Sequence, residues 1–126
     1  MLITFSKWLG FLTILLGVGG LMLGEESIGG LLNIELVEDL IHIITGAILL
    51  YAGFSDNTQV ARKILGTLGV IYLLVAIIGM TISPNLFGLL PNHGYSVVDN
   101  VIHLALGIIF ILVARKYKNS IVEVQM

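Results

Sequence analysis

The sequence predicts an all-α fold, a bundle of four transmembrane helices that forms a single membrane domain over residues 1–126. Of the 126 residues, 57% are hydrophobic and only 11% are charged, and the mean hydropathy is +1.05. A water-soluble domain of this size does not carry so apolar a composition. The chain is therefore expected to be an integral membrane protein whose first partner is the lipid bilayer.

Polar breaks divide the chain into four apolar runs, and each is one expected helix. At about 1.5 Å per residue, each run reaches roughly the 30 Å of the hydrocarbon core. Continuous runs of this length favour helices, because barrel strands alternate over about ten residues. The expected spans are 5–23, 36–54, 64–82 and 97–114.

The basic residues predict the orientation of these spans. All six lie on one side of the four-span arrangement, whereas the opposite loops, 24–35 and 83–96, contain no lysine or arginine. By the positive-inside rule, both termini are expected in the cytoplasm. The six are Lys7, Arg62, Lys63, Arg115, Lys116 and Lys118.

Composition and motifs exclude several function classes. The net charge of −2 leaves no basic surface for nucleic acid. The absence of cysteine rules out thiol nucleophiles, disulfides and covalent c-type haem attachment. Since no G-x-S-x-G elbow and no phosphate-binding loop occurs, we expect a protein that is not an enzyme.

The two halves of the sequence resemble each other. An offset of 61 residues aligns "VEDLIHIITG" at 37–46 with "VVDNVIHLALG" at 97–107. Each half is then one helical hairpin, and both hairpins cross the membrane in the same direction. This internal repeat predicts a pseudo-two-fold axis along the membrane normal.

The repeated motif places an acid, a histidine and a glycine at four-residue steps, which is one face of a helix. Both histidines are expected near the outer end at equal depth, where two imidazoles and up to three carboxylates can converge. Ionisable groups at membrane depth are costly and by default indicate a functional site. Histidine and carboxylate suit zinc, iron or manganese, and the candidate ligands are Glu38, Asp39, His42, Asp99 and His103.

Two other ligand hypotheses use the same motif. His42 and His103 are candidate ligands of a tetrapyrrole, either a bis-histidine haem or a chlorophyll, although close helix packing leaves little room for a macrocycle. Alternatively, the carboxylate–histidine pairs move protons or ions. The inner halves of the spans are almost wholly apolar, which weakens that hypothesis.

A purely structural interpretation competes with all three. Ser96 and Asp99 have the form of a capping box, and Glu38 with Asp39 are expected to serve the second helix likewise. The histidines would then fix helix packing. Small residues recur every seven positions, which allows close helix approach: Gly10, Gly17, Gly24, Gly46, Gly53, Gly69, Ala76, Ser83, Gly107 and Ala114.

The motifs also resemble those of a known family. "GLLN...VEDLIHIITGAI" and "GLLPN...VVDNVIHLALGII", with "KILGTLGVIYLLVAIIGM" between them, look like an uncharacterised family of small four-helix prokaryotic membrane proteins, the domain of unknown function numbered 4383. The resemblance implies a four-helix fold and the cytoplasmic-type membrane of a prokaryote. It implies no activity.

Together these observations predict a non-enzymatic membrane protein that acts by helix association. We expect an accessory or structural subunit of a larger membrane complex, or a homo-oligomer, because small contact residues are abundant in all four spans. The alternative function is metal or tetrapyrrole binding at His42 and His103.

Overall fold

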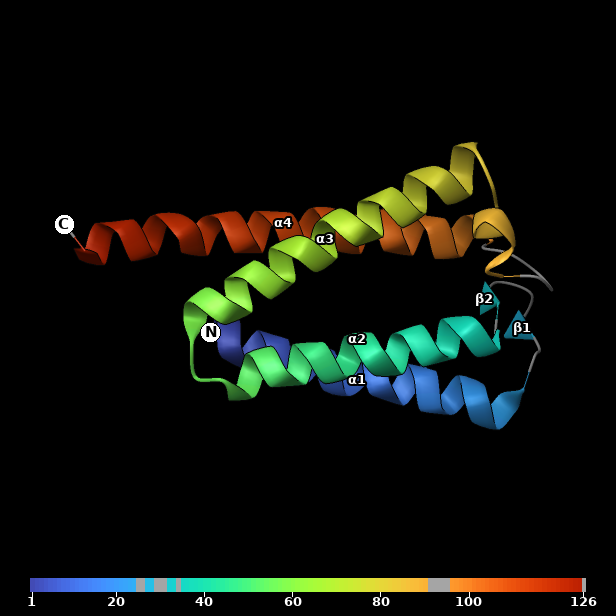
Figure 1. The fold of residues 1–126 in the computed structure, drawn as a ribbon, viewed down its shortest axis with the longest axis horizontal. Coiled ribbons are helices and arrows are strands. Elements are labelled where there is room, and N and C mark those ends of the chain that lie inside the picture. Colours follow the sequence, from blue (N-terminus) through green and yellow to red (C-terminus); the bar gives the residue numbers. More distant parts are fainter. Residues whose placement is uncertain (25–26, 29–31, 34, 91–95, 126) are drawn as a thin grey trace.

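The computed structural model contains four long helices, which confirms the predicted all-α fold (Figure 1). It describes residues 1–24, 27–28, 32–33, 35–90 and 96–125. Each helix contains a segment long and apolar enough to cross a membrane. The helices are α1 (Leu2–Leu23), α2 (Leu36–Phe54), α3 (Thr58–Thr81) and α4 (Val97–Gln125).

Helix α2 has the bounds of the expected span, α1 begins earlier than expected, and α4 ends later. Helix α3 begins six residues before its expected span and ends one residue before the expected end. Helix α3 begins at Thr58 because Asn57 caps it: the Asn57 Oδ1 accepts hydrogen bonds from the backbone amides of Gln59 at 3.0 Å and Val60 at 3.2 Å. Hydropathy could not detect this turn because it is polar. Polar and basic turns likewise continue α4 past residue 114.

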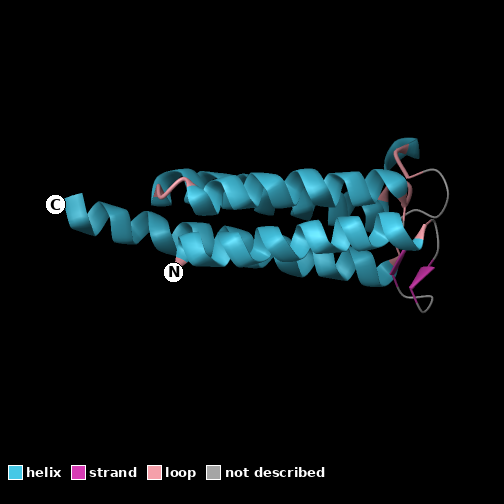
Figure 2. Ribbon diagram, turned by 90° about the horizontal axis from the view of Figure 1, so that it is seen from below, coloured by secondary structure: helices cyan, strands magenta, loops and turns pink. Residues whose placement is uncertain are grey.

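The helices pack as two hairpins, α1 on α2 and α3 on α4 (Figures 1 and 2). Glycines allow the close approach within each hairpin. A Cβ built at Gly46 would lie 2.7 Å from the carbonyl oxygen of Gly10, and one at Gly107 would lie 2.9 Å from that of Gly69. The predicted packing role is therefore confirmed for these four residues.

Gly24 has a different role from the glycines that pack within the hairpins. It follows the last residue of α1 with φ 78°, a left-handed conformation that glycine adopts without a steric penalty. A Cβ built there would meet no atom of the described chain within 4 Å. Gly24 thus ends the helix and makes no helix contact.

A buried apolar cluster joins all four helices in the half of the bundle near the chain termini. It closes that end, where both termini and the α2–α3 turn lie (Figure 1). The helix segments that carry the basic residues also lie there. The cluster consists of Leu2, Leu49, Ala52, Ala61, Leu65, Leu68, Tyr72 and Phe110.

The opposite end carries the two long connections. In the first, β1 (Ser27–Ile28) pairs antiparallel with β2 (Leu32–Asn33). In the second, a short 3-10 turn, η1 (Leu86–Gly88), is followed by the buried Leu90. Residues 30–31 and 91–92, which belong to the repeated loop motifs, lie outside the described residues. Between this end and the apolar cluster lies a polar region.

Candidate metal centre

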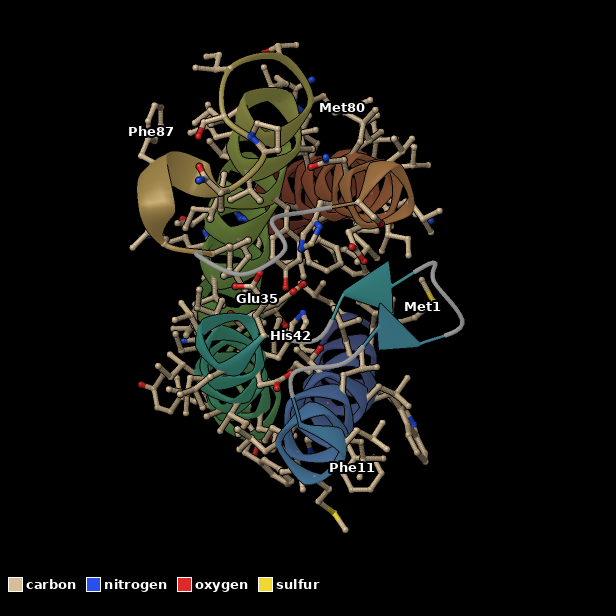
Figure 3. The ribbon with its side chains drawn as sticks, turned by 90° about the vertical axis from the view of Figure 1, so that its right-hand side faces the viewer. Met1, Phe11, Glu35, His42, Met80 and Phe87 are labelled. Atoms are coloured by element: carbon tan, nitrogen blue, oxygen red, sulfur yellow. The ribbon has the colours of Figure 1, made fainter. Side chains whose placement is uncertain are left out.

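Three of the predicted ligands meet between the two hairpins. Glu38 and His42 lie one turn apart on α2, and His103 comes from α4. Each offers one ligand atom, and these atoms all lie within 4.8 Å of one another. Figure 3 shows His42 directed into the space between the hairpins, whereas Phe11 lies on the outer surface.

The triad of Glu38, His42 and His103 borders a cavity of about 240 Å³. All four helices contribute to its wall. From α1 come Thr13 and Gly20, from α3 comes Tyr72, and from α4 comes Asp99. The cavity thus lies at the junction of the hairpins, outward of the apolar cluster.

His103 is held in the orientation typical of a metal ligand. Its Nδ1 lies 2.7 Å from the backbone carbonyl oxygen of Asp99. A carbonyl oxygen only accepts, so Nδ1 carries the proton and Nε2 carries the lone pair. The ring also packs edge-on against Tyr72, with centroids 5.3 Å apart. Metal-binding histidines commonly donate their second N–H to such a carbonyl.

Glu38 presents a buried oxygen that needs a partner. The side chain is only 5% exposed, and its Oε2 has no hydrogen-bond partner among the described residues. An unsatisfied buried polar atom costs about 1–3 kcal/mol, and more when it is charged. A cation or a hydrogen-bond donor in the cavity would therefore be stabilising.

The charge of the cavity also favours a cation. Its described lining contains the carboxyl groups of Glu38, Asp39 and Asp99 but no lysine or arginine. Carboxylates at membrane depth require a compensating partner. A bound divalent cation would supply one.

Asp99 lies outside the triad because its carboxylate caps α4. Its Oδ2 accepts hydrogen bonds from the Ser96 amide at 3.1 Å and the Ser96 hydroxyl at 2.8 Å, and the Ser96 hydroxyl oxygen accepts one from the Asp99 amide at 3.1 Å. The predicted capping box is confirmed. Of the two acids aligned by the repeat, only Glu38 contributes to the triad.

Asp39 is also outside the triad, although it lines the cavity. It packs against Gly20 of α1, where any Cβ would collide with the Asp39 carboxylate. At the start of α2, the position that corresponds to Ser96 is occupied by Glu35, whose side chain makes no capping hydrogen bond. The first half of the chain therefore lacks the serine of the capping box.

Sequence reasoning missed Tyr72. This residue is only 8% exposed, lines the cavity and contacts both the His103 and Phe110 rings. The available signal was a phenol in the middle of an otherwise apolar span, since a buried tyrosine hydroxyl usually has a partner.

The chain matches no family model, no curated protein and no solved structure. Its site is therefore interpreted from its own chemistry. Two imidazoles and one carboxylate form the ligand set of many zinc and non-haem iron sites. With bonds of about 2.1 Å, tetrahedral ligands lie roughly 3.4 Å apart, so small side-chain rotations would close the triad onto an ion.

The same geometry disfavours a tetrapyrrole. Pockets for organic ligands usually enclose about 300–1,000 Å³, and this cavity of about 240 Å³ is smaller. The third group, Glu38, also has no role in bis-histidine haem ligation. Of the two cofactor classes considered from the sequence, a metal ion fits these residues better.

Proposed function

We propose that this integral membrane protein binds a divalent transition metal ion, zinc or iron(II), through Glu38, His42 and His103. The observation that supports this function most strongly is the convergence of the three ligand atoms within 4.8 Å from two separate hairpins. The fixed His103 ring and the Glu38 oxygen, which has no partner among the described residues, add independent support.

A metal in this position would join the hairpins. Glu38 and His42 belong to the α1–α2 hairpin, and His103 belongs to the α3–α4 hairpin. A ligand that binds only the folded state stabilises it, by about 4 kcal/mol when its concentration is 1,000 times the Kd. The ion would therefore strengthen the contact between hairpins at the polar end of the bundle.

Metal analysis of paired variants tests this proposal. Protein purified in detergent without a histidine tag is loaded with zinc or cobalt(II), dialysed, and assayed by elemental analysis and visible absorption. We expect one metal per chain in the wild type. Glu38→Gln and His103→Gln should each weaken binding by at least about tenfold, because each removes a ligand.

Asp39→Asn is the matched control, because it neutralises the neighbouring carboxylate without touching the triad. It should retain stoichiometric metal and lose less affinity than Glu38→Gln, because it removes a charge from the cavity wall but no ligand. Equal metal content in the wild type and Glu38→Gln would overturn the proposal. So would an equal loss in Asp39→Asn and Glu38→Gln.

We further propose that the hairpins are related by a pseudo-two-fold axis along the membrane normal. Matched contacts support it: Gly10 meets Gly46 as Gly69 meets Gly107. Near the polar end, Gly20 packs against Asp39, and Gly79 packs against Asn100 in the same way. On α2 and α4 the matched residues are 61 positions apart, which is the register of the internal repeat, whereas on α1 and α3 they are 59 positions apart.

The remaining expectations from the sequence stay proposals. Cytoplasmic termini rest on the positive-inside rule, and membership of the family of domain of unknown function 4383, with its prokaryotic membrane location, rests on the quoted motifs. The accessory or oligomeric role rests on the abundance of small contact residues. A metal that stabilises the bundle is compatible with that role.

A further inference from the structure

The cavity has an opening on one side of the bundle. Close packing joins α1 to α2 and α3 to α4, and α3 touches both helices of the first hairpin, but α1 and α4 are not a closely packed pair in the described part of the chain. Residues from these two helices form the rim. Leu15 is 51% exposed, Leu16 is 60% exposed and Ile102 is 40% exposed, and all three line the cavity.

The opening faces hydrocarbon. Its rim residues lie within the membrane-spanning segments of α1 and α4, and an exposed apolar side chain at that depth contacts lipid. A molecule dissolved in the bilayer can therefore reach the cavity sideways, without crossing the polar loops at the end of the bundle.

Gly19 widens this opening. It lines the cavity, and a Cβ built at Gly19 would meet no described atom within 4 Å. It lies one turn from Leu15 on the same face of α1. A side chain at position 19 would thus begin in open space at the rim.

The floor of the cavity differs in character from its rim. The floor is formed by Glu38, whose Oε2 has no partner in the described part of the chain, and by the two histidines. An apolar rim above a polar floor suits an amphiphile that inserts its head and leaves its tail in lipid. The volume of the cavity limits the size of the head group. A cavity of about 150 Å³ holds benzene, so a cavity of about 240 Å³ accommodates one substituted ring.

We infer that the cavity binds, from the bilayer, an amphiphile that carries one hydroxyl-bearing aromatic ring on a hydrocarbon tail, the class of alkylphenols and quinols. This inference rests on the proposed metal site, because three protein ligands leave a coordination position for the ring oxygen. The hydroxyl proton would pass to the carboxylate oxygen of Glu38 that does not bind the metal, and the tail would pass Gly19 into the membrane.

The test uses the full chain in phosphatidylcholine nanodiscs, loaded with cobalt(II) and titrated with 4-nonylphenol. Because cobalt absorption depends on its ligands, we expect the bands to shift and saturate with 4-nonylphenol and to stay unchanged with nonylbenzene, which lacks the hydroxyl. Gly19→Phe should keep the cobalt bands but raise the half-saturating concentration by at least about tenfold, since it fills the rim.

Val18→Phe is the matched control. Val18 neighbours Gly19, is 41% exposed and does not line the cavity, so this variant should respond like the wild type. Cobalt bands that 4-nonylphenol leaves unchanged, an equal response to nonylbenzene, or an unchanged titration of Gly19→Phe would overturn this inference alone. A wild type without cobalt bands would overturn the metal site on which it rests.

Discussion

Replacing Gly46 by alanine should destabilise the first hairpin. The added Cβ would lie 2.6 Å from Cγ1 of Ile14 and 2.7 Å from the carbonyl oxygen of Gly10, whereas ordinary contacts begin at 3.4 Å. One of these neighbours is backbone and cannot rotate away. Helices α1 and α2 must therefore separate by roughly 0.7 Å, and a gap of this order forfeits a quarter to a half of each dispersion contact.

Extra atoms forced into a well-packed contact typically lower stability by about 1–3 kcal/mol. The free energy of unfolding should fall by that amount, which shifts the folding equilibrium by roughly 5- to 150-fold. Titration of the protein with SDS in mixed micelles, followed by far-ultraviolet circular dichroism, measures it. Gly107→Ala should behave similarly, because its Cβ would lie 2.9 Å from the carbonyl oxygen of Gly69.

Gly19→Ala is the control, since its Cβ meets no described atom within 4 Å. It should be unchanged or more stable by up to about 1 kcal/mol, the difference in helix propensity. A Gly46→Ala variant that unfolds at the same SDS fraction as the wild type would refute the close approach of α1 and α2. Equal destabilisation by Gly19→Ala would refute the conclusion that Gly46 packs against a neighbouring helix and Gly19 does not.

Three further predictions concern the cap, the cavity and the orientation. Ser96→Ala should lower the free energy of unfolding by about 0.5–2 kcal/mol. Its effect should not add to that of Asp99→Asn, and additive losses in a double-mutant cycle would contradict the capping box. Tyr72→Leu should weaken metal affinity by about 2- to 10-fold through loss of the ring contact with His103, whereas Tyr72→Phe, which keeps the ring, should stay close to the wild type. In this cysteine-free chain, a membrane-impermeant maleimide applied to intact cells should label Ser83→Cys but not Ser55→Cys, and the reverse pattern would contradict the expected orientation.

The spans could be predicted from the sequence because lipid imposes a simple constraint. A chain segment in hydrocarbon must satisfy its backbone internally, so long apolar runs become helices. Where water or lipid headgroups surround the chain, they can hydrogen-bond to the backbone, so hydropathy no longer predicts the structure. The polar first turn of α3 at Thr58 depends on the local cap from Asn57, and hydropathy carries no information about it.

The candidate site could be predicted only in part. Helical periodicity placed Glu38 and His42 on one face of α2, and the structure brings them together with His103. It could not decide between Glu38 and Asp39, which point about 100° apart around the helix. That choice depends on the rotation of α2 against α1, which the contact between Gly20 and Asp39 helps to set.

The acidic residues of the two motif copies, Glu38 and Asp99, thus have different roles. The difference arises from the residue one helical turn before each of them. In the second half, Ser96 engages Asp99 and keeps its carboxylate at the helix end. In the first half, the corresponding residue is Glu35, which has no hydroxyl, and Glu38 is one methylene longer than aspartate. Its carboxylate therefore extends into the cavity, which both histidines also line. A pair of similar hairpins consequently forms an asymmetric set of two imidazoles and one carboxylate.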